Sequence, residues 1–466
     1  MLRYIGPFLR MNKLNIKQVE NQLFHLSKES LKNIVLHSKC GITLNLKDLN
    51  LKHISSSDIN TLNLNSPLLC IYKKGNPKIK IQNNSYSWVE DKYKKDINIS
   101  SNAYMTLCLL ELIEYYKGFK NLDSAKYSLS ITYTELAKKQ LDFYASFLRN
   151  AEGVFIDKKD CTDPIIGKIK LKDSNKEFKF SEQCLLMNAF YKCSGYLDGN
   201  SKDSFKDFSL DILKMFVDFK EEMYEISFND KALLCLNLNI FYSYSSMDEA
   251  KILSLDIFDL LYEEYTKSTN NDKIQDICIM YLNAALLYKH TNLFRFKKIC
   301  ISLIELLTKH YNEELSIFIK PGEDKEMKFS SEDIILYIIS MLYHHKLGEE
   351  VSEDIISEVF RNQLVDSGII LSWPDAPNLD DLEHYKDFKS LPENLLEEQY
   401  FKMSTISTPE NSEVAPIFLK NVIYNKDKRT FKQGKVDFDS RKNLNLFFFI
   451  LHFLNDKTCN YLETNI

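Results

Sequence analysis

Four short stretches of the sequence begin in nearly the same way: FSEQCLL at residues 180–186, FNDKALL at 228–234, NDKIQDI at 271–277 and FSSEDII at 329–335. In each, polar and acidic residues come directly before an apolar run, which is the pattern of a helix start. The starts are 48, 43 and 58 residues apart. This period indicates repeated helical hairpins with an insertion before the last copy, and it exceeds the period of about 34 residues of tetratricopeptide repeats.

Outward from these starts, the chain divides into pairs of expected helices with apolar side chains at three-to-four spacing. The five clear pairs are Asn102–Lys117 with Ser124–Leu148, Glu182–Leu197 with Asp203–Lys220, Asp230–Tyr244 with Asp248–Tyr265, Lys273–Lys289 with Asn292–Tyr311, and Glu332–His345 with Glu353–Gln363. A sixth pair is weaker: Arg441–Leu454 is a clear helix, and its partner helix is expected around Leu395–Met403 or Ala415–Tyr424. Loops within pairs are short and those between pairs are long, so the long loops open at one end.

Local capping signals accompany two of the expected helix starts. Ser246 with Glu249 predicts a capping box for the helix from Asp248. Thr291 is expected to cap the helix from Asn292.

The first hundred residues follow a different pattern, in which short apolar runs are broken by Asn, Ser and Lys. An amphipathic helix is expected over Gln18–His37, and strands are expected over Leu68–Tyr72, Lys78–Ile81 and Tyr86–Val89. We therefore expect a small N-terminal α+β region over residues 1–100 and a helical-hairpin toroid over residues 101–466.

Composition agrees with a helical globular chain. With 12 Gly and 10 Pro in 466 residues, and 44% hydrophobic and 27% charged residues, the chain has neither the turns of a β-sandwich nor the composition of a disordered segment. The 60 basic and 65 acidic side chains nearly balance, which argues against nucleic acid or a membrane surface as a partner. The most apolar run, Leu444–Leu454, is too short to span a bilayer.

The ten cysteines include no CxxC pair, so no zinc knuckle is expected, and neither a metal nor a cofactor is predicted. The adjacent pair His344 and His345 cannot both face one ion from a helix. Five cysteines in apolar helical stretches are expected to pack as small hydrophobic side chains: Cys108, Cys184, Cys235, Cys278 and Cys300. Reduced thiols suit the cytoplasm.

The hairpin count and the one-sided long loops, with strand-like passages at Gly153–Asp157 and Leu315–Lys320, resemble the six-hairpin (α/α)₆ toroid superfamily. That group includes many glycoside hydrolases, polysaccharide lyases and sugar epimerases. The resemblance covers about Ser101 to the C-terminus and implies a mainly α fold whose funnel is lined by inner-helix N-termini and long loops. It matches no family-specific motif, so it assigns no functional residue. An open α-solenoid of the same hairpins is the alternative fold.

Candidate site residues concentrate in the loop SGIILSWPDAPNLDDLEHY, residues 367–385. An aromatic face beside carboxylates is what glycoside chemistry requires. The predicted catalytic residues are Asp375, Asp380, Asp381 and Asp157, and the predicted substrate-binding residues are Trp373, Tyr385, His384 and Glu222. The structural alternative is that Trp373 plugs the rim of the toroid, while Asp380 and Asp381 cap a short helix near Leu382.

Two functions remain open from the sequence. One is a carbohydrate-active enzyme that uses carboxylate acid/base chemistry on an oligosaccharide. The other is a non-catalytic helical-repeat protein that binds a peptide, protein or glycan, or serves as a scaffold. An enzyme requires at least two carboxylates from different loops in one concave pocket.

Overall fold

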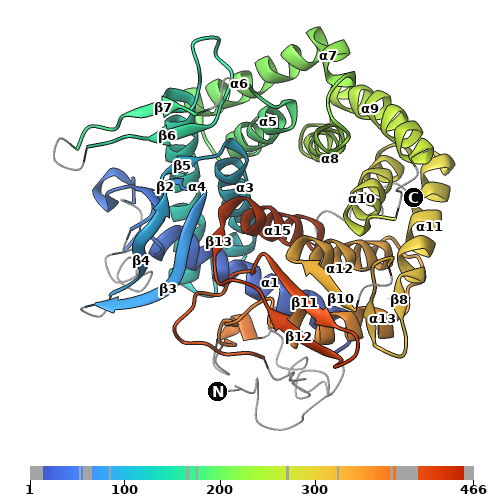
Figure 1. Ribbon diagram of the computed structural model, residues 1–466. Coiled ribbons are helices and arrows are strands. Elements are labelled where there is room, and N and C mark those ends of the chain that lie inside the picture. The colour runs from blue at the N-terminus through green and yellow to red at the C-terminus, as the bar shows by residue number, and fades with distance from the viewer. Residues whose placement is uncertain are drawn as a thin grey trace.

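The computed structural model describes residues 14–51, 54–55, 66–82, 85–163, 167–174, 177–268, 272–322, 325–377, 381–384 and 408–455. Its main feature is a closed ring of helices in two layers (Figure 1).

The inner layer consists of six helices, each in contact with the next: α3 (Ile99–Lys117), α5 (Phe180–Ser194), α8 (Phe228–Ser245), α10 (Ile274–Thr291), α12 (Ser331–Lys346) and α15 (Ser440–Phe453). These helices are apolar on most sides, and an unbroken run from Ser331 to His344 is buried apart from Glu332. A helix that is hydrophobic all round is stable only where neighbours cover every face, which explains their position inside the ring.

The outer layer packs against the inner one and consists of α4 (Ser124–Phe147), α6 (Gly199–Asp218), α9 (Asp248–Lys267), α11 (Phe294–Lys309), α13 (Glu353–Val359) and α1 (Ile16–Lys32). Two of them continue as π-helical turns, α13 into Phe360–Val365 and α1 into Asn33–His37. The short helix α7 (Lys220–Tyr224) lies between α6 and α9.

Ring closure is direct, because α15 contacts α3 along its length. The Tyr104 ring lies 5.6 Å from that of Phe448 and 6.4 Å from that of Phe449, between centroids, and Cys108 Sγ lies 3.5 Å from the carbonyl oxygen of Leu444. The (α/α)₆ toroid expected from the sequence is therefore confirmed, and the open solenoid is excluded.

The sixth hairpin differs from the expected one. Leu395–Met403 lies outside the described residues, and no helix forms over Ala415–Tyr424, whose end belongs to strand β11 (Asn421–Asn425). Val422 and Tyr424 are buried while their neighbours are partly exposed, a period of two that suits a strand. The outer partner of α15 is instead α1, from the other end of the chain. The division at residue 100 stays a prediction, but α1 is part of the ring.

Both expected helix caps are wrong. Ser246 has a left-handed backbone, φ 55°, and ends α8, while Met247 stands at the N-cap of α9 without a side-chain hydrogen bond. Thr291 is the last residue of α10, and its hydroxyl donates to the carbonyl of Leu287. In both cases the tight turn between two helices uses the polar residue to end the first helix.

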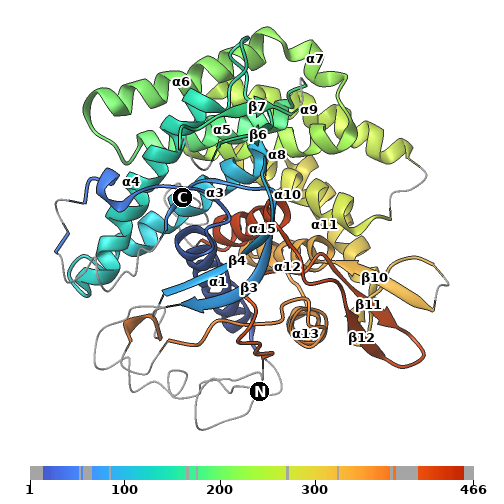
Figure 2. The same ribbon diagram turned by 60° about the vertical axis from the view of Figure 1, so that its left-hand side comes forward.

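Small antiparallel sheets decorate the ring: β1 (Gly41–Thr43) with β2 (Leu68–Ile71); β3 (Lys74–Gln82) with β4 (Ser85–Lys94) and β13 (Phe438–Asp439); β5 (Asp96–Ile97) with β6 (Lys158–Asp160) and β7 (Leu171–Asp173); β8 (Tyr311–Asn312) with β9 (Ile317–Phe318); and β10 (Glu326–Ser330) with β11 and β12 (Thr430–Gln433). Figure 2 shows the β10–β11–β12 sheet projecting from the body. The strands expected in the N-terminal region correspond to β2, β3 and β4.

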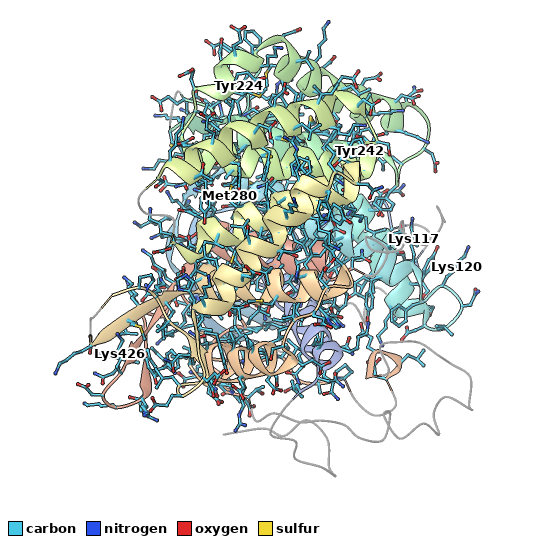
Figure 3. All side chains as sticks on the ribbon, turned by 90° about the vertical axis from the view of Figure 1, so that its right-hand side faces the viewer. Lys117, Lys120, Tyr224, Tyr242, Met280 and Lys426 are labelled. Carbon is cyan, nitrogen blue, oxygen red and sulfur yellow. The ribbon has the colours of Figure 1, made fainter. Side chains whose placement is uncertain are left out.

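The two ends of the ring differ. Inner helices begin at the end that carries the sheets and long loops, and they end at the other, where short loops lead to the outer helices. Figure 3 shows Lys117, the last residue of α3, and Lys120 at the opposite end of the molecule from Lys426, which follows β11. All five helical cysteines named above are buried, as expected. Within the described residues, no helix has the length and apolar character needed to cross a membrane.

Candidate active site

A cavity of about 520 Å³ opens where the six inner helices begin. Every inner helix contributes residues from its first turns or from the residue before it. These include Asn98, Ser100 and Tyr104 at α3, Glu182 at α5, Asn237 at α8, Asp276 at α10, Glu332 at α12, and Arg441 and Asn445 at α15. This cavity, called the funnel below, is the feature that the toroid resemblance implied.

Glu182 is the most perturbed carboxyl group of the funnel. It lies in the first turn of α5 and is 9% exposed. Burial, and then the negative charge of Asp157, raise its pKa to about 7, against the opposing effect of Lys179 and Arg441. A carboxyl group with this pKa carries a proton in a large fraction of molecules at neutral pH, as a general acid requires.

Asp276, in the first turn of α10, is the second carboxylate of interest. It lines the funnel and makes no hydrogen bond or ion pair with the residues that the structure describes. Burial raises its pKa, and the charge of Lys273 opposes that shift. Asp276 is therefore available to a ligand.

The other acidic groups near the funnel have structural partners. Glu332 forms an ion pair with Lys442, and Asp439 accepts a hydrogen bond from the Lys442 backbone amide at 3.2 Å as the N-cap of α15. Asp230 accepts a hydrogen bond from the Ser181 hydroxyl, and burial raises its pKa. Glu182 also has a hydrogen bond with Ser100. Neither Glu182 nor Asp276 forms an ion pair with a described residue, so these two carboxyl groups are the candidates for acid/base chemistry.

Several buried amide oxygens around the funnel have no hydrogen-bond partner among the described residues: Asn98 Oδ1, Asn237 Oδ1 and Asn445 Oδ1. Asn237 is only 1% exposed, and its Nδ2 already donates to the Ser181 carbonyl. An unpaired buried acceptor costs about 1–3 kcal/mol. Ligand hydroxyl groups that donate to these oxygens would recover that free energy, so the lining suits a molecule rich in hydroxyls.

Of the residues predicted from sequence, Asp157 is the one beside the funnel. Its carboxylate accepts hydrogen bonds from Asn98 Nδ2 at 2.8 Å and from the Ile99 amide at 2.9 Å, which holds the start of α3. Through its charge it also raises the pKa of Glu182. The structure thus places it as a neighbour of the acid.

Trp373 and Asp375 lie elsewhere. Trp373 is 8% exposed and packs edge-on against Phe360, with ring centroids 6.1 Å apart. It borders a separate cavity of about 400 Å³ between the end of α1 and β3, which Asp375 also lines. The Asp375 carbonyl oxygen is 2.7 Å from His25 Nε2, and its side chain is exposed.

Asp381 lies near the opposite end of the ring from the funnel. It forms an ion pair with Lys126 in the first turn of α4, while the adjacent Glu383 accepts hydrogen bonds from Tyr115 at 2.9 Å and Lys28 at 2.5 Å. His384 belongs to a short 3₁₀ turn, Leu382–His384. Asp380 and Tyr385 lie outside the described residues.

Glu222 is exposed on α7, outside the inner ring. The structure therefore does not bring Asp157, Asp375, Asp381, Trp373 and Glu222 together in one pocket. The physical reason is that the loop after α13 runs outside the ring, past α1, to the end of the ring opposite the funnel. The funnel, in contrast, is lined by residues of the inner helices.

A signal for the funnel carboxylates was present in the sequence. Glu182, Asp230, Asp276 and Glu332 all lie within the four repeated helix starts. Acidic residues in a first turn are common because they interact favourably with the helix dipole. Their sequence pattern therefore indicates a site only in combination with the inner position of these helices. Among the described residues, no group of three His, Cys, Asp or Glu side chains is arranged to hold a metal ion.

Comparisons with known proteins add little. No family model matches the sequence, and no curated protein matches it. Among solved structures, the chain is similar to a GH76 alpha-mannanase from Bacteroides thetaiotaomicron, with a TM-score of 0.43 and 12% identity over 82% of this chain and 92% of that one. The architecture described above rests on the helix contacts themselves.

Proposed function

We propose that this protein is a carbohydrate-active enzyme that binds an oligosaccharide in the funnel and cleaves it by hydrolysis. The observation that carries the proposal is Glu182, a buried carboxyl group with a pKa of about 7 that lines a cavity with unpaired amide oxygens.

In the proposed reaction, protonated Glu182 donates its proton to the glycosidic oxygen as the C–O bond breaks. Asp276 takes a proton from the water molecule whose oxygen bonds to the anomeric carbon. The products are two shorter sugars, and the proton balance is restored when Asp276 and Glu182 exchange protons with solvent. The positive charge of Lys273 favours the ionised form of Asp276 and opposes the effect of burial on its pKa.

The cellular setting is part of the proposal. Burial raises the pKa of thiols such as Cys108 and Cys184, and the nine described cysteines form no disulfide. Unreactive, reduced thiols are consistent with a cytoplasmic protein, whose substrate would be a short oligosaccharide.

The test is turnover of a panel of neutral and acidic oligosaccharides, followed as new reducing ends. Glu182→Gln and Asp276→Asn should each lower the rate by about 100-fold or more, with thermal melts that show a folded protein. Glu222→Gln, an exposed change outside the ring, is the matched control and should retain the full rate.

Full activity in Glu182→Gln would contradict the proposal. Binding of a glycan by the wild type without cleavage of any panel member would favour the alternative, a non-catalytic binding protein that uses the same funnel.

A further inference from the structure

Arg441 is a guanidinium of the funnel that has no hydrogen-bond or ion-pair partner among the described residues. It lies in the first turn of α15, is exposed to the cavity, and makes no hydrogen bond or ion pair with any residue that the structure describes. Its charge acts on Glu182, Asp230 and Tyr104 at once, which places it near the starts of α5, α8 and α3. Its neighbour Lys442, by contrast, is neutralised by Glu332.

The unpaired guanidinium of Arg441 and the hydroxyl-accepting amide oxygens around it favour different chemical groups of a ligand. Arginine presents a planar fork of donors that matches a carboxylate. The unpaired oxygens of Asn237 and Asn445 in the same cavity instead accept from hydroxyl groups. A sugar that carries both a carboxylate and hydroxyls, a uronic acid, satisfies the two kinds of group together.

A second, independent observation lies on the sheet of β10, β11 and β12. The segment 420–435, which contains β11 and β12, carries six cationic side chains and one acidic one: Lys420, Lys426, Lys428, Arg429, Lys432 and Lys435 against Asp427. The whole chain, in contrast, has a net charge of −5. Arg429 is paired with Glu314, and β10 adds the acidic Glu326, so the remaining positive charge of the sheet is carried by its lysines.

The register of the sheet aligns two of its lysines on the solvent-facing side. Lys328 of β10 pairs with Ile423 of β11, which pairs with Lys432 of β12, so all three side chains share one face. Lys328 and Lys432 are exposed, while Phe329 and Val422 on the other face are buried. Within the described residues, neither lysine has an acidic partner.

The chain path joins this sheet to the funnel. β10 leads directly into α12, and β12 leads through β13 into α15, so the two edge strands of the sheet continue from the same end of the sheet to the helices that carry Glu332 and Arg441. Figure 3 shows Lys426, at the tip of the β11–β12 hairpin, far from Lys117 and Lys120 at the other end of the ring. A charged polymer could run from the sheet into the funnel.

We infer that the ligand of the funnel is an acidic oligosaccharide of uronic acid units, with one carboxylate on Arg441 and further carboxylates along Lys328 and Lys432. This inference rests on the proposed function for the location of the site and adds the substrate class.

The experiment measures binding by titration calorimetry with the inactive Glu182→Gln chain, so that the ligand is not consumed. The probes are oligogalacturonate hexamers, the same hexamers with methyl-esterified carboxyls, manno-oligosaccharide hexamers, and a single-stranded RNA. Oligogalacturonate should bind about tenfold or more tightly than its methyl ester, because esterification removes the charge and the bidentate acceptor.

Variants assign the effect to residues. Arg441→Gln should abolish the preference for the free acid, and Arg441→Lys, which keeps the charge but loses the fork, should restore only part of it. The double variant Lys328→Gln, Lys432→Gln should lower the affinity for the galacturonate hexamer but not for a galacturonate dimer. It should also reduce the salt dependence of hexamer binding. Lys120→Gln, an exposed change at the far end of the ring, is the control and should change nothing.

Equal affinity for the acid and its ester, or an unchanged preference in folded Arg441→Gln, would overturn the inference. Tighter binding of RNA than of any glycan would overturn it too. Binding of oligogalacturonate without cleavage by the wild type would support this inference while defeating the proposed hydrolysis. Glu182-dependent cleavage of neutral sugars alone would do the reverse.

Discussion

At the scale of single residues, Glu182 sets the pH behaviour of the site. Its pKa of about 7 in the folded chain lies above the ordinary value of 4.5, so the folded state holds the proton more firmly than the unfolded state. The raised pKa costs nothing below pH 4.5, and the cost to stability grows as the pH rises to about 7 and is complete above it.

Glu182→Gln should therefore stabilise the protein at pH 8, by up to about 3 kcal/mol, and should have little effect at pH 4. Thermal melts of the two chains at both pH values measure this. A variant that melts earlier than the wild type at pH 8 would show that the carboxylate is better accommodated than its burial implies.

Trp373 is a second residue whose role differs between the two interpretations of its loop. Because the ring is largely buried against Phe360, Trp373→Ala should cost about 3 kcal/mol of stability or more and leave binding in the funnel unchanged. Asp381→Asn, which removes a partly exposed ion pair with Lys126, should cost about 1 kcal/mol or less. Melts and glycan titrations of both variants test this; loss of glycan binding with a normal melt would restore the loop as the site.

At the scale of secondary structure elements, one side chain can both cap the start of an inner helix and act on the funnel. Asp157 holds the start of α3 and also raises the pKa of Glu182. Asp157→Asn should keep most of the cap, at a cost of about 1 kcal/mol or less, and should move the basic limb of the activity profile to lower pH because the neighbouring negative charge is gone.

The matched control for that prediction is Asp123→Asn. Asp123 caps α4 by accepting from the Lys126 amide at 3.0 Å, at the end of the ring away from the funnel. The Asp123→Asn variant should lose a similar amount of stability, but its pH–activity profile should not shift. An equal shift in both variants would mean that stability, and not the charge of Asp157, controls the limb.

At the scale of the whole molecule, a buried ionic cluster ties four inner helices together below the funnel. Glu111 Oε1 of α3 accepts from Lys192 of α5 at 2.5 Å and from the Tyr244 hydroxyl of α8 at 2.7 Å, and it lies 2.9 Å from His452 Nδ1 of α15. Burial alone would raise the pKa of Glu111, but Lys192 and then His452 hold it well below its usual range. The cluster spans the junction where the ring closes.

Glu111→Gln should cost about 3–5 kcal/mol at neutral pH, since it leaves Lys192 buried without its counter-charge. Because the folded pKa of Glu111 is depressed, its contribution is present above pH 4.5 and is lost as the pH falls below that value. The variant should thus approach the wild type in stability at low pH, as measured by denaturant titration at pH 7 and pH 3. Glu263→Gln, an exposed change on the outer helix α9, is the control. A loss of stability that is equal at both pH values would contradict the electrostatic explanation.

The sequence by itself determined the five clear hairpins, the mainly α class and the burial of the helical cysteines. These properties depend on local periodicity and on which faces of each helix are apolar, and both can be read from neighbouring residues. The strands β2, β3 and β4 followed from the same kind of local pattern.

Only the tertiary structure decided which residues share the funnel. Closure brings α15 against α3 and uses α1 as the outer partner of the last helix, a contact between chain ends that no local period encodes. The loop around Trp373 had the composition of a site but runs outside the ring, whereas Glu182 and Asp276 looked like ordinary first-turn acids. Their role depends on burial and on neighbours from distant helices, because desolvation and nearby charge, not residue type, shift a carboxyl pKa towards 7.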